Sequence, residues 1–159
     1  AAGLYSMRLN APPQISDPVL ARWLHDVYVA MVIHLGAPTP CWSQSNVAAG
    51  QAGVGLNLLG ATSNSEIVLA APGDIVGISA SSNEARTAGT LTVRPTINGV
   101  ASSSLEAVIN GTDVQYAFGV TRHSLETFGA GSRIGLQITT SADWAPATAD
   151  IVCNLIVLF

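Results

Sequence analysis

The residues of this 159-residue chain that could carry out chemistry are few, and they form no catalytic motif. The histidines are His25, His34 and His123. His25 and His34 are nine residues apart in one expected helix, which places them on different faces rather than as a metal pair. No base–nucleophile pairing can be placed around His123, and nucleophile-elbow, P-loop and dinucleotide motifs are missing. The sequence therefore predicts a protein that is not an enzyme.

The acidic and cysteine residues also form no recognisable functional motif. Five acids fall in expected loops, from which Ca²⁺ draws oxygen ligands: Asp74, Glu84, Asp113, Asp143 and Asp150. The spacing of a calcium loop is missing, so solvated turn positions are the simpler interpretation. Cys41 and Cys153 are too few for a disulfide framework, and we expect both to be small buried apolar side chains. We expect no metal and no cofactor.

Trp144 is an aromatic residue in a loop between two expected strands. One interpretation is that its ring contacts a ligand or another subunit, since tryptophan combines a large apolar face with one hydrogen-bond donor. The other is that the ring folds over the end of the protein core. The sequence leaves both interpretations open.

The overall composition predicts a surface partly covered by partners. Apolar residues make up 48% of the chain and charged residues 10%, against about a quarter in soluble domains. The six basic residues are all arginine, and with ten acids the net charge is −4, so the chain lacks the basic patch of a nucleic-acid-binding protein. No segment has the roughly 18–20 consecutive apolar residues of a membrane helix. We expect neither nucleic acid nor membrane as a partner.

Two elements are expected before the main domain. Residues 1–15 predict an extended arm, since few of their apolar residues are in phase and they include Pro12-Pro13. Residues 16–36 predict an α-helix, because Pro18 suits its first turn and Gly36 the position after its end. The apolar stripe of this helix is Leu20, Leu24, Val27 and Met31. The stripe either packs on its own subunit or forms a short seam between symmetry-related helices.

Residues 41–159 predict one all-β domain. They are rich in Val, Ile, Thr and Ser, with tight-turn pairs at Asn98-Gly99 and Asn110-Gly111. We expect strands at 42–49, 54–59, 66–71, 74–81, 90–98, 104–109, 112–120, 133–140 and 150–158. Eight or nine antiparallel strands without a second helix predict a β-sandwich or jelly roll.

A weak internal repeat indicates two related halves. Residues 72–80 align with residues 130–138. In the second copy, side chains alternate between the two faces of a strand, and this alternation directs one set inward: Ile134, Leu136 and Ile138. The same register applied to the first copy turns inward Val76, Ile78 and Ala80. Each half would then contain a glycine turn, a strand, a loop and a returning strand.

The C-terminal strand is apolar on both faces. Ile151, Cys153, Leu155, Val157 and Phe159 share one face, and Ile156 and Leu158 occupy the other. Such a strand must be central in its sheet or buried between subunits. We therefore expect the segment Leu155, Ile156, Val157, Leu158 and Phe159 to take part in self-association.

The sequence patterns of residues 72–98 and 128–158 resemble those of tailed-bacteriophage virion proteins that end in a trimeric jelly roll. The segments that carry the resemblance are Ala88–Val93 with Asn98-Gly99, Gly129–Leu136, and Asp143–Pro146 leading to Asp150–Val152. Such domains have the architecture of tumour necrosis factor and of the complement globular head. The resemblance contains no diagnostic motif.

The resemblance implies a homotrimeric virion protein, assembled in the host cytoplasm and displayed on the particle surface. With only an arm and one helix ahead of the domain, it favours a capsid decoration (cement) or head-fibre protein. The trimer interface would comprise the C-terminal run and the helix stripe. The arm would dock on the major capsid protein or another virion protein, through Leu4, Tyr5, Met7, Arg8 and Leu9. Alternatives are a tail or fibre receptor-binding domain for a host surface glycan and a non-viral carbohydrate-binding module.

Overall fold

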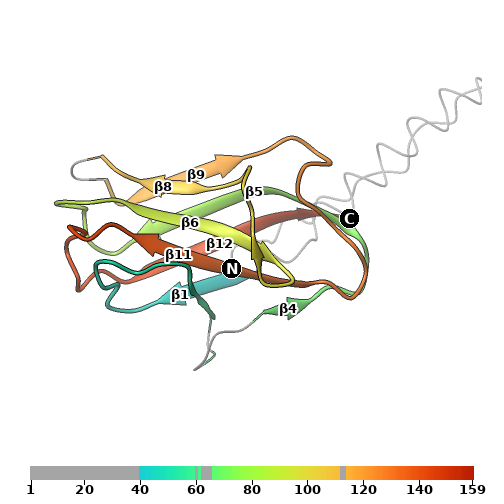
Figure 1. Ribbon diagram of the computed structural model, residues 1–159, viewed down its shortest axis with the longest axis horizontal. Coiled ribbons are helices and arrows are strands. Elements are labelled where there is room, and N and C mark those ends of the chain that lie inside the picture. Colours follow the sequence, from blue (N-terminus) through green and yellow to red (C-terminus); the bar gives the residue numbers. More distant parts are fainter. Residues whose placement is uncertain (1–39, 60, 62–65, 112–113) are drawn as a thin grey trace, which may run out of the picture. The chain divides into compact units, whose positions relative to one another are not determined.

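The protein, described from a computed structural model, is all-β in the part that the structure describes, residues 40–59, 61, 66–111 and 114–159 (Figure 1). No helix occurs among these residues, and so none that could cross a membrane. The expected arm (1–15) and helix (16–36) lie outside the described residues. They stay predictions.

Twelve strands form two antiparallel sheets. Sheet A has the order β10-β5-β12-β1-β3, with β9 also paired to β5. Its strands are β1 (Cys41–Gln44), β3 (Asn57–Leu58), β5 (Gly73–Ser82), β9 (Tyr116–Val120), β10 (Thr127–Phe128) and β12 (Ile151–Leu158). Sheet B has the order β2-β11-β6-β7, with β4 also paired to β11 and β8 to β6. Its strands are β2 (Val54–Gly55), β4 (Ile67–Val68), β6 (Leu91–Ile97), β7 (Val100–Ala101), β8 (Ala107–Ile109) and β11 (Arg133–Thr140).

The two sheets pack face to face as a β-sandwich. Alternate residues of β11 and β12 enter the core between the sheets, where Ile138 and Leu155 are fully buried. Leu91 and Val93 of β6 and Trp42 of β1 complete the centre. β12 lies between β1 and β5, which confirms one of the two expected positions for an apolar terminal strand.

The expected strand positions largely match those in the structure. The structure adds β7 and β10, which the sequence pattern did not predict. Asn98 and Gly99 have φ values of 52° and 82° and join β6 to β7, as expected for a two-residue hairpin turn.

The inward-facing positions predicted from the internal repeat are correct for β11, but they are out of register at the start of β5. Ile134, Leu136 and Ile138 are buried as predicted, and so are Ile78 and Ala80. In β5, however, Val76 is only half-buried, and Ile75 occupies the core.

A β-bulge explains this correction. Ile156 pairs with Gly77, and the next residue, Val157, pairs with Ile75, which leaves Val76 as an extra residue. Because one extra residue reverses the alternation beyond it, Ile75 turns inward.

At one edge of the sandwich, β8 of sheet B and β9 of sheet A lie side by side (Figure 1). A Cβ atom at Gly119 of β9 would lie 1.9 Å from the backbone oxygen of Glu106. No side chain fits there without moving the backbone.

We predict that Gly119→Ala lowers the free energy of unfolding by about 2 kcal/mol or more, because the methyl group overpacks the contact between the two sheets. Urea unfolding of the full chain measures this change. Gly129→Ala is the matched control, since a Cβ there would meet no atom within 4 Å. Its expected effect is within about 0.5 kcal/mol. Equal stability of the two variants would contradict the close approach.

Candidate functional site

Among the described residues, His123 comes nearest to a catalytic arrangement. Its Nε2 atom lies 2.8 Å from Oδ2 of the buried Asp74, and its Nδ1 atom lies 2.9 Å from Oγ of Ser124. This connectivity resembles a Ser–His–Asp relay. The His123 side chain is 67% exposed, however, so solvent surrounds the group that would have to work in a site closed to water. The arrangement favours a surface contact that covers Asp74.

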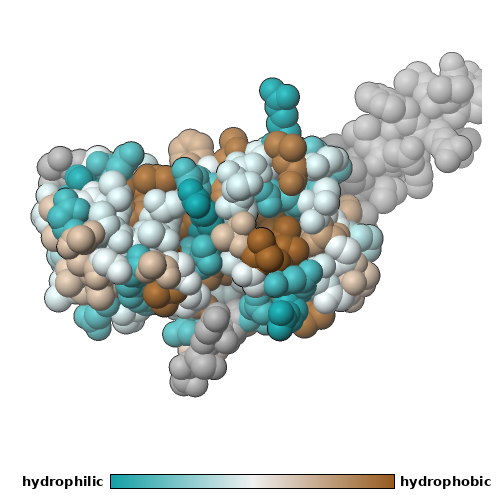
Figure 2. Space-filling model, viewed as in Figure 1, coloured by the Kyte–Doolittle hydropathy of each residue, from teal (hydrophilic) through white to brown (hydrophobic). Residues whose placement is uncertain are grey.

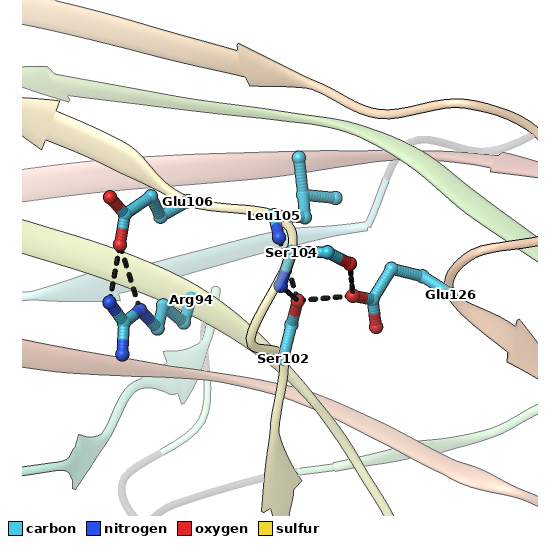
Figure 3. Close-up of polar contacts among 6 residues, drawn as sticks. All are labelled: Arg94, Ser102, Ser104, Leu105, Glu106 and Glu126. Atoms are coloured by element: carbon cyan, nitrogen blue, oxygen red, sulfur yellow. Dashed lines mark hydrogen bonds and ion pairs between the residues drawn. The ribbon is translucent and has the colours of Figure 1, made fainter.

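A second polar cluster joins the segment between β7 and β8 to the end of the loop before β10 (Figure 3). The hydroxyls of Ser102 and Ser104 both donate to Oε1 of Glu126, the former at 2.5 Å. Ser102 Oγ also accepts a hydrogen bond of 2.8 Å from the backbone N–H of Leu105. These bonds tie the segment that follows β7 to the residue that precedes β10.

We predict that Ser102→Ala lowers the free energy of unfolding by about 1–3 kcal/mol, because it leaves the Leu105 N–H and a buried Glu126 oxygen short of a partner. Ser103→Ala is the control, since Ser103 is exposed. Thermal or urea unfolding of both variants provides the measurement. A Ser102→Ala protein as stable as the control would show that the cluster contributes nothing.

The two cysteines lie on different faces of sheet A. Cys153 is buried in the core, and Cys41 is half-buried, with its Sγ atom hydrogen-bonded to Oδ1 of Asn154. Both are free thiols. Burial, with a smaller contribution from nearby Cys41, raises the pKa of Cys153 from 9.0 to about 12. The prediction of a buried apolar side chain is confirmed for Cys153.

We predict that Cys153 in the native protein resists iodoacetamide at pH 8, because the thiolate is the reactive form and the thiol stays protonated. Mass spectrometry after labelling, with and without denaturant, measures this. The raised pKa of Cys153 also determines the direction in which stability changes with pH. The unfolded chain loses this proton above pH 9 while the native chain keeps it, so stability falls as pH rises from about 9 to 12. Rapid native labelling of Cys153 would contradict the burial.

The acids considered as calcium ligands are dispersed. Asp150 accepts from the backbone of Asn46, and Glu84 from the hydroxyl of Thr148. Asp113 lies outside the described residues. Within the described part of the chain, no three acidic, histidine or cysteine side chains form a group that could hold a metal ion.

The most distinctive surface is a row of large apolar side chains on the outside of sheet A, here called the sheet A outer face. β9 contributes Tyr116, Phe118 and Val120, which are 72%, 74% and 72% exposed. β12 contributes Val152 and Ile156, which are 39% and 51% exposed.

Strand register aligns these residues on one face. Tyr116 pairs with Ser81, which pairs with Val152 on its other side. Val120 pairs with Gly77, which pairs with Ile156. The intervening β5 residues are small (Gly77, Ser79 and Ser81), so the apolar side chains of β9 and β12 flank them on one surface. These rows contain no charged residue.

Local packing explains why β9 turns its large residues outward. Its inward positions are Ala117, which packs against the core, and Gly119, where the close approach of Glu106 leaves no room for a side chain. The bulky residues that alternate with them must therefore point to the other side.

Sheet B is mixed by contrast: it carries charged pairs on its outer face, and its strands also expose Val54, Val68 and Val100 at 41%, 67% and 71%. Arg94 binds Glu106 through Nε at 2.9 Å and Nη2 at 2.5 Å (Figure 3). Arg133 Nε lies 3.4 Å from Glu66 Oε2. The view in Figure 2 shows a face of the domain on which hydrophilic and hydrophobic residues are intermixed, as is usual for solvated protein surface.

The expected interface residues divide between core and surface. Leu155 and Val157 are buried inside their own subunit, which corrects their assignment to an interface. Ile156 and Phe159 are exposed, at 51% and 48%, and Leu158 is half-buried. The helix stripe (Leu20, Leu24, Val27, Met31) and the arm residues (Leu4, Tyr5, Met7, Arg8, Leu9) lie outside the described residues.

The C-terminal residues also line an apolar cavity of about 280 Å³ between the two sheets. Its walls are Pro40, Leu58, Ile67, Leu69, Val157 and Phe159. The Phe159 ring meets Phe128 edge-on, with centroids 6.2 Å apart and an interplanar angle of 83°. The apolar chain end thus extends the core.

Trp144 belongs to the core. It is 3% exposed, and its Nε1 is buried without a hydrogen-bond partner among the described residues. The ring therefore offers no face for ligand stacking, which corrects that interpretation and favours the alternative of a loop aromatic folded onto the core.

The sequence predicts a strand at 112–120, with Tyr116 as a core or interface residue, and does not single out Phe118 or Val120. The available signal was the alternation of Tyr116, Phe118 and Val120 with Ala117 and Gly119. Large and small residues in strict alternation fit a strand with a crowded inner face.

Comparisons with known proteins identify no family. No family model matches the sequence, and no curated protein matches it. Solved structures that match include the globular domain of zebrafish complement 1qA protein, with 14% identity and a TM-score of 0.43. The match covers 77% of this chain and 98% of that one. At this distance the similarity carries no functional information.

Proposed function

We propose that this protein is a non-enzymatic structural subunit that assembles with copies of itself through the sheet A outer face. The observation that carries the proposal is the contrast between the two sheets. Sheet A presents five exposed apolar side chains on one face without a charge, whereas the exposed valines of sheet B (Val54, Val68 and Val100) lie on three separate short strands beside two arginine–glutamate pairs. Monomeric proteins rarely expose a contiguous apolar patch of this kind.

The aromatic content of the patch also fits a protein interface. Tyrosine and phenylalanine are enriched at interface cores, where charged residues are depleted. Burial of apolar surface contributes about 25 cal/mol per Å² removed from water, so Phe118 and Tyr116 would supply much of the association energy.

We propose further that the sandwich is a jelly roll and that the assembly is a homotrimer. Strand order supports the jelly roll, since both sheets contain strands from the two halves of the chain. The number three rests on the resemblance of the sequence to virion jelly-roll domains.

The same resemblance supports a place on a virus particle, as a capsid decoration or head-fibre protein bound to the major capsid protein or another virion protein. The arm residues Leu4 to Leu9 would dock on the shell. Three weak arms on one trimer bind far better than one, since each bound arm raises the effective concentration of the others.

We predict that Phe118→Glu converts the oligomer to a monomer without unfolding it, because it places a charge among the exposed apolar side chains of the sheet A outer face. Val100→Glu is the matched control: Val100 is equally exposed, at 71%, but belongs to sheet B. Sedimentation velocity gives the mass, and circular dichroism the fold. The wild type and the control should have three times the mass of one chain. A monomeric wild type at micromolar concentration, or a Phe118→Glu trimer, would refute assembly through this face.

The number of copies of this protein in purified virus particles tests its proposed place on the particle. Hundreds of copies per particle would support capsid decoration, and a handful would support the alternative of a tail or fibre receptor-binding domain. Absence from particles would overturn the virion proposal and leave a non-viral carbohydrate-binding module as the remaining alternative.

A further inference from the structure

Sheet B carries a polar hollow of about 150 Å³ on its outer face. β11 pairs with β4 at Ile134 and with β2 at Gln137, and the hollow lies at the gap between these two short strands. Its walls include the side chains of Glu66, Thr96 and Gln137, and three glycines, which add no side chain, keep it open.

Gly135 lies beneath two of the wall residues of the hollow, Thr96 and Glu66. It pairs with Thr96 across β6 and β11. A Cβ atom at Gly135 would lie 3.0 Å from Thr96 Oγ1 and 3.1 Å from Glu66 Cγ. Both polar side chains therefore lean over this glycine from opposite sides.

Thr96 is the residue that points to a ligand. It is only 7% exposed, and its side chain makes no hydrogen bond within the described part of the chain. The hydroxyl oxygen itself is reachable by solvent, since it is not one of the fully buried polar atoms without a partner. Because Thr96 lines the hollow, a molecule bound there can hydrogen-bond to this hydroxyl in place of water.

We propose that this hollow binds one neutral sugar unit of a glycan through its hydroxyl groups. A threonine hydroxyl and a glutamine amide each donate and accept hydrogen bonds, and a carboxylate accepts from two neighbouring hydroxyls. Glu66 disfavours an anion. Its contact with Arg133, at 3.4 Å, already offsets its charge and disfavours a cation. A polar wall disfavours an apolar ligand.

The size and position of the hollow agree with such a ligand. Its volume equals about five water molecules and is below the range of drug-sized sites, so it holds one small ring rather than a chain. It belongs to a single subunit, so the inference does not depend on the proposed assembly. If sheet A is buried between subunits, the hollows on sheet B face outward and several can bind one glycan surface.

Two-dimensional NMR of the full-length ¹⁵N-labelled protein tests the proposal, with the methyl glycosides of glucose, galactose and N-acetylglucosamine as probes. At least one should shift the amide signals of Gly135 and Gln137 in a saturable way. N-acetylneuraminic acid, an anionic sugar, should not.

Thr96→Val should weaken this binding at least about fivefold, because it removes the hydroxyl and keeps the shape. Thr92→Val is the matched control, as Thr92 is on the same strand and face, four residues away. Gly135→Ala, whose methyl group would push against the wall residues Thr96 and Glu66, should also weaken binding. Both expectations require a folded variant, which the same spectra verify.

Three results would overturn the proposal: no shift at Gly135 or Gln137 with any neutral glycoside at tens of millimolar, shifts confined to another surface, or equal affinity of Thr96→Val and wild type. The Phe118→Glu variant separates the two proposals, since a monomer should bind the free glycoside with unchanged affinity. Sugar displayed on a polymer should bind the oligomer more tightly than this monomer, which distinguishes a glycan surface from a free sugar.

Discussion

The placement of β12 between β1 and β5 organises the rest of the structure. Its eight residues pair along almost their whole length with β5, and its first four with β1. This pairing turns Ile151, Cys153, Leu155 and Val157 into the core, where they meet the inward residues of sheet B. The opposite side of the same strand becomes the sheet A outer face. Core and candidate interface are thus the two sides of one pairing register, and a slip of one residue would exchange them.

Crowding at the edge of the sandwich explains how an apolar surface arises on a folded domain. β8 and β9 approach so closely at Gly119 that β9 can place only small residues inward. Its aromatic residues remain outside, where each exposes most of its surface to water. In an isolated subunit that exposure costs free energy, and association of subunits offsets it. The same packing that closes the sandwich therefore supplies a reason for assembly.

The outer faces of the two sheets differ in chemistry. Self-association is proposed for sheet A and ligand binding for sheet B. Sheet A is suited to contact with another protein, because its outer rows contain apolar and small neutral residues. Sheet B carries two arginine–glutamate pairs and a polar hollow lined by Glu66, Thr96 and Gln137, beside scattered exposed valines. A subunit with one continuous apolar face and a polar hollow on the other sheet can bind copies of itself and still present a recognition surface.

The sequence by itself determined the all-β class of residues 41–159, most strand positions and the hairpin turn at Asn98-Gly99, and it limited the last strand to two positions, central in a sheet or buried between subunits. These features depend on local signals, namely alternation with period two and turn residues with positive φ. Tertiary structure decided the rest. The bulge at Val76 arises only when β12 pairs with β5, and Trp144 enters the core only when its loop closes over the sandwich. Exposure of Phe118 and the hollow at Thr96 depend on which strands become neighbours. Such pairings join residues far apart in the chain, and no local pattern encodes them.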